Sequence, residues 1–296
     1  YVNDSVSWSN GNTLTMKAHN DIIINNTITN SGAGALNLRS DSDGNGGGTV
    51  LFGAGGHVYF SGGQASIYYN PAGGYTAPVN YSGYFTGVTP TAYMLINNVT
   101  DLQNVNNNLT GNYALGANIN ASATSGWNGG KGFEPLGDDT LNDPTKVFSG
   151  IFDGNGYTIS NLYINRPTER YVGMFAATYK VSTVRNVWLE NVNITGGYQV
   201  GGVMAHISGG DGNYGTLSHS YVTGTVTGHD IVVGGLVGLN AGIISNCYSK
   251  ATVNGSGNSY VGGLVGDLWG PDARIVNSYS TGLVTNAASP VGGLVG

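Results

Sequence analysis

Acidic and amide side chains that lie close together in the sequence are the first candidates for chemistry in this chain. The segment DSDGNG, residues 41–46, has oxygen-bearing side chains at positions 1, 3 and 5 and glycine at position 6, as does the first half of an EF-hand-type calcium loop. The glutamate expected at position 12 of such a loop is replaced here by Phe52. Asp41, Asp43 and Asn45 are therefore candidate calcium ligands, whereas a glycine-rich turn is the simpler interpretation.

A second acidic cluster lies between residues 126 and 146, in a stretch rich in glycine and proline. It contains Glu134, Asp138, Asp139 and Asp143. Glycoside hydrolysis needs two carboxyl groups roughly 5–9.5 Å apart, and β-helix polysaccharide enzymes take such groups from adjacent coils. These acids share one loop, with no basic side chain obviously paired with them, so we expect a solvated loop without catalytic residues. The chain is predicted not to be an enzyme.

Beyond the calcium candidate, histidine and cysteine spacing predicts no metal site and no cofactor. The histidines show no H-x-x-x-H or similar ligand spacing; they are His19, His57, His206, His219 and His229. His219 occupies a repeat position that later repeats fill with asparagine, which indicates a wall position tolerant of either residue. Cys247 is the only cysteine and cannot form an internal disulfide. Its apolar neighbours predict a small buried residue.

Aromatic and asparagine side chains are the remaining candidates for binding or modification. Trp127 and Trp269 fall in or near loops, where exposed rings could stack on sugars, although aromatic residues also fill the corners of solenoid coils. Asn-x-Ser/Thr triplets are acceptors for N-glycosylation, and many arise by chance in an asparagine-rich chain. The predicted glycosylation sites are Asn98, Asn108, Asn120 and Asn193.

A repeated hexapeptide predicts the elements that must position these residues. The sequence VGGLVG begins at Val233, Val261 and Val291, and looser copies begin at Val172 and Val200. The starts are therefore 28 to 33 residues apart, a period typical of solenoids and other stacked arrays. In such a chain most residues stack one coil on the next. Each Gly-Gly pair allows close backbone approach or a bend between two wall sheets.

The region before these repeats divides in two. Residues 1–90 alternate apolar and polar residues with a period of about 22, since Leu14, Leu36 and Val58 are evenly spaced. This pattern predicts short strands in the coils of a parallel β-helix. Residues 91–146 break the rhythm and predict an irregular excursion.

The excursion predicts a short helix and a loop. The helix is expected around residues 99–102, with Thr100 or Asp101 as its N-cap. The stretch 126–146 is expected to protrude from the coil wall. From residue 147 to residue 296 the chain returns to coils of about 30 residues.

Composition disfavours several classes of protein. Glycine accounts for 51 of 296 residues and charged residues for only 9%, against about 25% in a typical soluble domain. The net charge of −6, with Lys and Arg scattered along the chain, makes nucleic acid a poor partner. No apolar run is long enough for a membrane-spanning helix. Neither end has the atypical sequence of a capping repeat, so we expect an internal segment of a larger protein.

These residues also carry a family resemblance that covers essentially the whole chain. Residues 147–296 resemble the GLUG motif, which is named for the Gly-Leu-Val-Gly pattern. The runs NVNNNL (104–109), GNYALG (111–116) and FDGNG (152–156) resemble the central region of filamentous-haemagglutinin-type adhesins of Gram-negative bacteria. The resemblance implies a right-handed parallel β-helix that is exported through an outer-membrane partner protein to the cell surface.

The combined prediction is a single all-β solenoid, continuous over regions 1–90, 91–146 and 147–296. The predicted function is the shaft or binding segment of a large secreted or cell-surface adhesin or extracellular fibre. Its predicted partners are glycans or proteins of host or neighbouring cells, and exposed coil edges could allow self-association into fibres. The alternative is a polysaccharide-binding or polysaccharide-degrading β-helix protein. An ice-binding solenoid would need regular Thr-x-Thr ranks, and only isolated ones occur.

Overall fold

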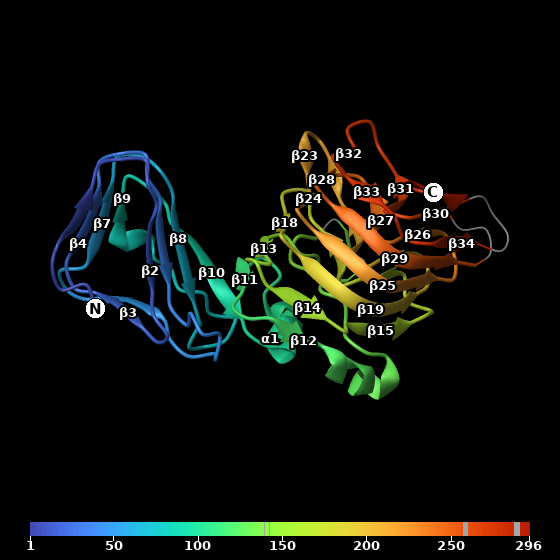
Figure 1. The fold of residues 1–296 in the computed structure, drawn as a ribbon, viewed down its shortest axis with the longest axis horizontal. Coiled ribbons are helices and arrows are strands. Elements are labelled where there is room, and N and C mark those ends of the chain that lie inside the picture. Colours follow the sequence, from blue (N-terminus) through green and yellow to red (C-terminus); the bar gives the residue numbers. More distant parts are fainter. Residues whose placement is uncertain (139, 142, 257–259, 287–290) are drawn as a thin grey trace. The chain divides into compact units, whose positions relative to one another are not determined.

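The computed structural model is built predominantly of β-strands and describes the chain except residues 139, 142, 257–259 and 287–290 (Figure 1). The chain forms two compact units: a first unit of residues 1–97 and 111–117, and a second unit of residues 98–110 and 118–296. In both units successive coils pair as parallel strands. The predicted all-β parallel β-helix is therefore confirmed. No helix among the described residues has the length and hydrophobicity needed to cross a lipid bilayer.

The first unit stacks its strands in three parallel sheets. Alternate side chains of a strand point to the same face, and Leu36, Leu38 and Ile67 are fully buried in the interior. A 3₁₀ turn, η1 (Ser82–Tyr84), precedes the last strand of one sheet. The sheets are β1 (Val6–Trp8), β4 (Thr27–Asn30), β7 (His57–Phe60) and β9 (Phe85–Thr86); β2 (Leu14–Lys17), β5 (Leu36–Arg39), β8 (Ala65–Tyr69), β10 (Thr91–Ile96) and β11 (Tyr113–Leu115); and β3 (Ile22–Ile24) with β6 (Val50–Phe52).

The predicted 22-residue period holds for only the first coil of this unit. Leu14 pairs with Leu36, but Leu36 pairs with Ala65 and not with Val58. Val58 pairs instead with Ile28. The period is wrong for the second coil because that coil also contains the glycine-rich turn at residues 41–48, which lengthens it.

The second unit contains the long parallel ladders. The sheets are β13 (Ile151–Asp153), β18 (Thr183–Arg185), β24 (Thr216–Ser218), β28 (Ile243–Ser245) and β32 (Arg274–Val276); β12 (Ile119–Asn120), β14 (Thr158–Ser160), β19 (Trp188–Gly196), β25 (Tyr221–Gly228), β29 (Tyr248–Gly255) and β33 (Tyr279–Ser280), with β15 (Tyr163–Arg166) on β19 and β34 (Val284–Asn286) on β29; β16 (Tyr171–Val172), β20 (Gln199–Gly201), β26 (Val232–Gly234), β30 (Tyr260–Gly262) and β35 (Val291–Gly292); and β17 (Phe175–Thr178), β21 (Met204–Ile207), β27 (Val237–Asn240) and β31 (Val265–Leu268). Thr183, Thr216, Ile243 and Arg274 occupy one row, so these coils follow one another at spacings of 27 to 33 residues.

The repeated hexapeptide forms the corner between two of these sheets. In the copy that begins at Val233, Gly234 ends β26 and Val237 begins β27. A Cβ atom added to Gly234 would lie 1.9 Å from the Val237 carbonyl oxygen, a separation that no side chain could occupy. The same carbonyl contact faces Gly201 and Gly262 in the neighbouring coils. Glycine is therefore required here by the close approach of backbone, as the hexapeptide predicts.

A second corner explains the exchange of asparagine and histidine between repeats. Asn186, His219, Asn246 and Asn277 each have φ between 49° and 55°. This left-handed conformation is costly for most residues, and asparagine, aspartate and histidine are enriched in it. The next position in the turn is buried, and there Cys247 is 1% exposed. Burial raises the pKa of the Cys247 thiol to about 11, so the predicted small buried residue is confirmed.

Aromatic rings stack along the outside of one sheet, where β19, β25 and β29 lie side by side (Figure 1). Trp188, Tyr221, Tyr248 and Tyr279 are paired in successive coils. The Tyr221 and Tyr248 rings are 4.8 Å apart and nearly parallel. These rings pack on one another's faces, so they stabilise the stacking of coils.

The predicted excursion is a short helix followed by a segment that returns to the solenoid. Helix α1 (Val99–Asn104) confirms the predicted helix, and the 3₁₀ turns η2 (Val105–Asn107) and η3 (Ser122–Gly130) follow it. The N-cap is Asn98, whose side chain accepts a hydrogen bond from the Asp101 backbone N–H. Thr100 and Asp101 were therefore the wrong residues for the cap. The Asn98 side chain accepts a hydrogen bond from an N–H group of the first turn, which has no carbonyl partner within the helix.

Candidate functional site

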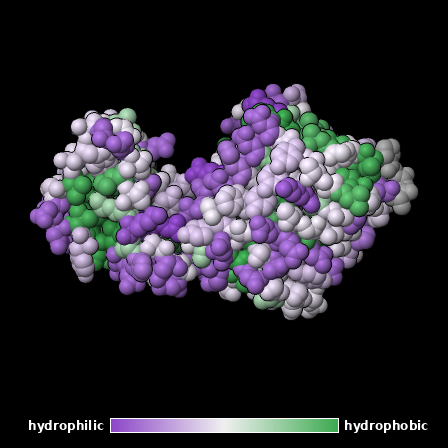
Figure 2. Space-filling model, viewed as in Figure 1, coloured by the Kyte–Doolittle hydropathy of each residue, from purple (hydrophilic) through white to green (hydrophobic). Residues whose placement is uncertain are grey.

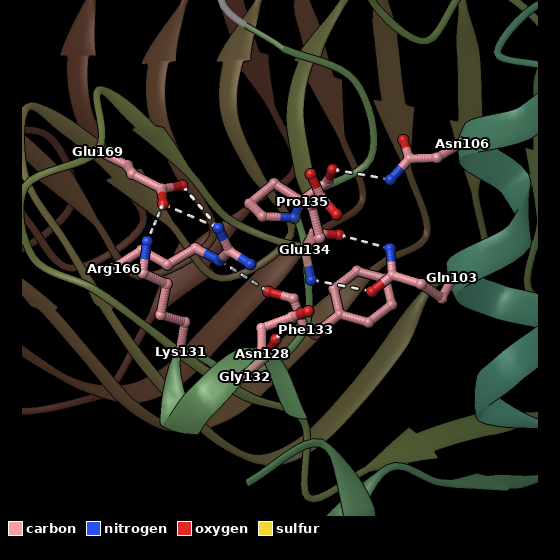
Figure 3. Close-up of polar contacts among 10 residues, drawn as sticks. All are labelled: Gln103, Asn106, Asn128, Lys131, Gly132, Phe133, Glu134, Pro135, Arg166 and Glu169. Carbon is pink, nitrogen blue, oxygen red and sulfur yellow. Dashed lines mark hydrogen bonds and ion pairs between the residues drawn. The ribbon is translucent and has the colours of Figure 1, made fainter. Parts of the chain in front are cut away.

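Two side-chain amides fix the chain after η3 to the helical segment of the second unit (Figure 3). Gln103 Nε2 donates to the Glu134 carbonyl, and the Glu134 N–H donates to Gln103 Oε1; both distances are 2.9 Å. Asn106 contacts the Pro135 carbonyl and the Gly137 N–H in the same way. Each amide thus replaces the backbone partner that a neighbouring strand would supply.

This segment is partly buried, which corrects the prediction that all of residues 126–146 protrude. Phe133 and Leu136 are fully buried, and Leu136 forms a parallel bridge with Phe175. Arg166, which is 8% exposed, donates from Nε to the Phe133 carbonyl and from Nη1 to both carboxylate oxygens of Glu169 (Figure 3). Apolar burial and a paired arginine therefore hold the segment against the coil.

The acidic residues of the excursion make local contacts. Asp143 Oδ1 accepts hydrogen bonds from the N–H and hydroxyl of Thr145, which lower the pKa of Asp143. Asp138 Oδ1 accepts from the Thr140 N–H. Asp139 lies outside the described residues. Glu134 and Asp138 do line one hollow together with Glu169, so the structure joins two of the predicted acids to one that sequence analysis did not select.

The predicted calcium ligands form a turn in the first unit. Asp41 is fully buried with φ at 50°. Its carboxylate accepts from the N–H groups of Asn45 and Gly46 and from the side-chain amide of Asn70. Asp43 accepts from the Asn45 side chain. Nitrogen donors thus occupy the oxygens that calcium would need, and no metal-binding group of His, Cys, Asp and Glu is present among the described residues. The geometry favours the turn, while calcium binding itself stays a prediction.

Replacement of Asp41 tests the two interpretations. We expect Asp41→Ala to lower the free energy of unfolding by about 2–4 kcal/mol, because three donors lose a charged acceptor. Asp43→Ala, at an exposed position, is the control and should change it by less than about 0.5 kcal/mol. Urea unfolding with and without calcium chloride measures both effects. A midpoint that rises with calcium in the unsubstituted protein, and not in Asp41→Ala, would support the metal site instead.

The four predicted glycosylation sites differ in their surroundings. Asn98 caps α1, and its amide also donates to Asp101. Asn108 Oδ1 accepts from the Thr110 hydroxyl, and Asn120 Oδ1 accepts from Asn161. Asn193 is exposed on β19. Glycosylation stays a prediction at all four.

A groove lies at one corner of the second unit, between two long connections. Residues 208–215, which include the antiparallel hairpin β22 (Gly209–Gly210) and β23 (Asn213–Tyr214), connect β21 to β24, and residues 269–273 connect β31 to β32. The coil between them turns through Ala241 and Gly242 alone. Above that short corner, the Tyr214 hydroxyl donates to Asp272 Oδ2 at 2.5 Å. Two long connections therefore bridge a gap that the short one leaves.

Two hollows form around this bridge. The larger is about 330 Å³, and its lining includes Lys180, His206, Ser208 and Leu239. The smaller is about 140 Å³ and includes Tyr214 and Asp272. Both are lined by Gly209, Ala241 and Trp269. Figure 2 shows hydrophilic surface at β23 beside apolar surface. The larger hollow falls in the size range of small-ligand sites.

The polar groups of the groove are mostly paired. Lys180 Nζ contacts Asp211 Oδ2, which lowers the pKa of Asp211 and raises that of Lys180. The contact with Asp272 raises the pKa of Tyr214, and burial lowers the pKa of His206 to about 4. The Ser208 hydroxyl, in contrast, is buried without a hydrogen-bond partner. Such orphaned groups are uncommon in folded proteins and mark places where a ligand or water can bind.

Sequence analysis identified one residue of this groove as a binding candidate. Trp269 is 63% exposed and lies in the connection after β31, whereas Trp127 is half-buried in η3 and is not among the groove residues. Tyr214, Asp272 and Ser208 were missed. The uneven spacing of the hexapeptides was the available signal, because the starts at Val200 and Val233 are 33 apart while the next start, Val261, follows after 28.

Comparison with known proteins confirms the repeat and the fold. The GLUG motif matches residues 230–254, which contain β26 to β28 and most of β29. A solved structure from Bacteroides ovatus, described provisionally as an immunoglobulin A1 protease, aligns with a TM-score of 0.54 over 69% of this chain and 62% of that one. At 22% identity, this likeness shows a shared fold.

Similar sequences occur within much longer proteins. Halomucin of Haloquadratum walsbyi is 39% identical over 209 residues, and the immunoglobulin A1 protease of Streptococcus sanguinis is 30% identical over 207 residues. These alignments cover 67% and 66% of this chain but only 2% and 10% of those proteins. A protein of Evansella cellulosilytica, described provisionally as a Gly-rich membrane protein, is 33% identical over 118 residues, which are 40% of this chain and 10% of that protein. The resemblance to filamentous-haemagglutinin-type adhesins stays a prediction.

Proposed function

We propose that this chain is a solenoid segment of a large secreted or cell-surface protein, in which it serves as a stiff shaft. The observation that carries the proposal is a parallel ladder of the second unit that continues from coil to coil. In the sheet of β18, β24, β28 and β32, four successive coils pair with their neighbours. Each coil is held by backbone hydrogen bonds and a buried apolar row on every wall, so bending requires many contacts to break together.

The comparisons support a place outside the cell. The similar proteins carry names of a mucin, an immunoglobulin A1 protease and a membrane protein, which are names of surface or secreted proteins. The chain corresponds to only 10% of the streptococcal protease, so the proposed shaft does not need to contain a catalytic residue. The finer role is that of a shaft in an adhesin or fibre that contacts glycans or proteins of neighbouring cells. Export through an outer-membrane partner protein belongs to the same proposal.

Stretching of single molecules tests the shaft. A coil of 28–33 residues spans roughly 90–120 Å when extended, at about 3.3–3.6 Å per residue, and contributes only about 5 Å to a folded solenoid. We therefore expect the second unit to unravel in steps of roughly 90–115 Å when it is pulled from its ends. Release of the whole unit in a single step would contradict a shaft built of separately held coils.

A cross-link between coils provides the control. Thr225 and Thr252 are paired in β25 and β29, and neighbouring parallel strands lie about 4.8 Å apart, within the Cα–Cα range of disulfides. In the oxidised double variant Thr225→Cys/Thr252→Cys, the chain between the two cysteines cannot extend. One step should then disappear, and reduction should restore it. An unchanged step pattern, with the disulfide shown to be formed, would mean that the steps do not report coils.

A further inference from the structure

We propose that the corner groove of the second unit binds a chain of neutral sugars. This binding activity is separate from the shaft role, because it depends on one corner and not on the repeated register. The groove exists because the connections at 208–215 and 269–273 are long while the coil between them turns through Ala241 and Gly242 alone. The two hollows share lining residues, so an extended occupant can lie across both.

The apolar part of the groove suits the flat face of a sugar ring. Trp269 is 63% exposed, and its backbone N–H donates to the Asn240 carbonyl of the preceding coil. That contact fixes the backbone at the start of the connection. Leu239 and Ala241 line the hollow beside it. An exposed indole that lines the same hollow as apolar side chains offers a large contact area at low entropic cost.

The polar part of the groove supplies an unused hydrogen-bonding group. Ser208 is 7% exposed, lines the larger hollow, and its Oγ has no hydrogen-bond partner. A hydroxyl can donate and accept. The Oγ atom is itself buried, so it would pair with a sugar hydroxyl after the Ser208 side chain rotates toward the hollow. An unsatisfied buried hydroxyl destabilises the free protein. Binding of a sugar at this position would remove that cost.

The charges favour a neutral occupant. Lys180 is paired with Asp211, so its positive charge is already balanced by a carboxylate. Asp272 is engaged by the Tyr214 hydroxyl, and Arg274 is close enough for its charge to lower the pKa of Tyr214. Two acidic and two basic groups thus surround the groove. A uronate or sialate would bring an uncompensated negative charge to this balanced site.

Binding of defined oligosaccharides to the full chain tests the proposal. The probes are neutral oligomers of glucose, xylose and N-acetylglucosamine, with oligogalacturonate as the acidic comparison. Tryptophan fluorescence and titration calorimetry report binding, and assay of reducing ends reports cleavage. We expect at least one neutral oligomer to bind, Trp269→Ala to weaken it at least tenfold, and Ser208→Ala to weaken it about fivefold or more. Tyr279→Ala, at another exposed aromatic residue, should leave the affinity unchanged.

Stability measurements separate binding from folding. Because the Ser208 hydroxyl has no partner in the free protein, Ser208→Ala should unfold at the same or a slightly higher urea concentration. Loss of binding in that folded variant would place the ligand at Ser208. The proposal is overturned if no neutral oligomer binds at millimolar concentration, if oligogalacturonate binds more tightly, or if Trp269→Ala binds as well as the unsubstituted protein. Released reducing ends would overturn a purely binding role. None of these results alters the stretching steps that test the shaft.

Discussion

Gly234→Ala is expected to lower the free energy of unfolding by about 3 kcal/mol or more. The new Cβ atom would lie 1.9 Å from the Val237 carbonyl oxygen and 2.6 Å from the Gly266 N atom of the next coil. Both atoms are backbone, so no side-chain rotation can relieve the contact. Overpacking of a well-packed site typically costs about 1–3 kcal/mol, and here two coils would have to separate as well.

Gly126→Ala is the matched control for that substitution. No atom lies within 4 Å of the position that a Cβ on Gly126 would take, so alanine should be neutral or stabilise the protein by up to about 1 kcal/mol. Equilibrium unfolding in guanidinium chloride gives both free energies, and limited proteolysis shows whether the second unit opens first. Equal midpoints for the two variants would mean that the corner relaxes at no cost, and the required role of glycine in the hexapeptide would be wrong.

Most of the fold could be predicted from the sequence because its main signals are periodic. The hexapeptides lie at a corner where Gly234 and its equivalents have no room for a side chain. The glycine pattern therefore indicates where the backbones of the coil corner approach closely. The 22-residue period predicted for residues 1–90 holds only for the first coil. A coil can contain a turn of any length at its corners. The turn at 41–48 lengthens one coil, so that Leu36 is 29 residues from its partner Ala65. The alternation of apolar and polar residues alone cannot distinguish that spacing from 22.

The groove was harder to predict because its residues come from four successive coils. Tyr214 and Asp272 are 58 residues apart, and nothing local in the sequence joins them. Ser208 is distinctive only because its hydroxyl has no hydrogen-bond partner, a property that the sequence does not show. The acidic residues gave the opposite difficulty. Asp41 and Asp43 are spaced like metal ligands, yet backbone and amide donors satisfy Asp41 in a turn, because short acidic side chains serve both purposes.

His206 should make the second unit less stable in mild acid. It lies on β21, 9% exposed, with Nδ1 2.9 Å from Gln199 Oε1 and its ring 5.8 Å from that of Tyr171. Lys180 lines the same hollow. Burial lowers the pKa of His206 from 6.5 to about 4. Below pH 6.5 His206 is therefore protonated in the unfolded chain, whereas in the folded protein it stays neutral until the pH approaches 4. The free energy of unfolding therefore falls as the pH falls from 6.5 toward 4.

Between pH 7.5 and pH 4.5 this histidine alone should remove about 2–3 kcal/mol from the free energy of unfolding. His206→Leu is the informative variant, because Leu239 fills the paired position in the next coil and leucine does not titrate. Urea unfolding at both pH values should show a loss that is about 2–3 kcal/mol smaller in His206→Leu than in the unsubstituted protein. The exposed His229 provides the control, and His229→Gln should retain the full loss. If the unsubstituted protein and His206→Leu lose stability in parallel, the proton that destabilises the fold binds elsewhere.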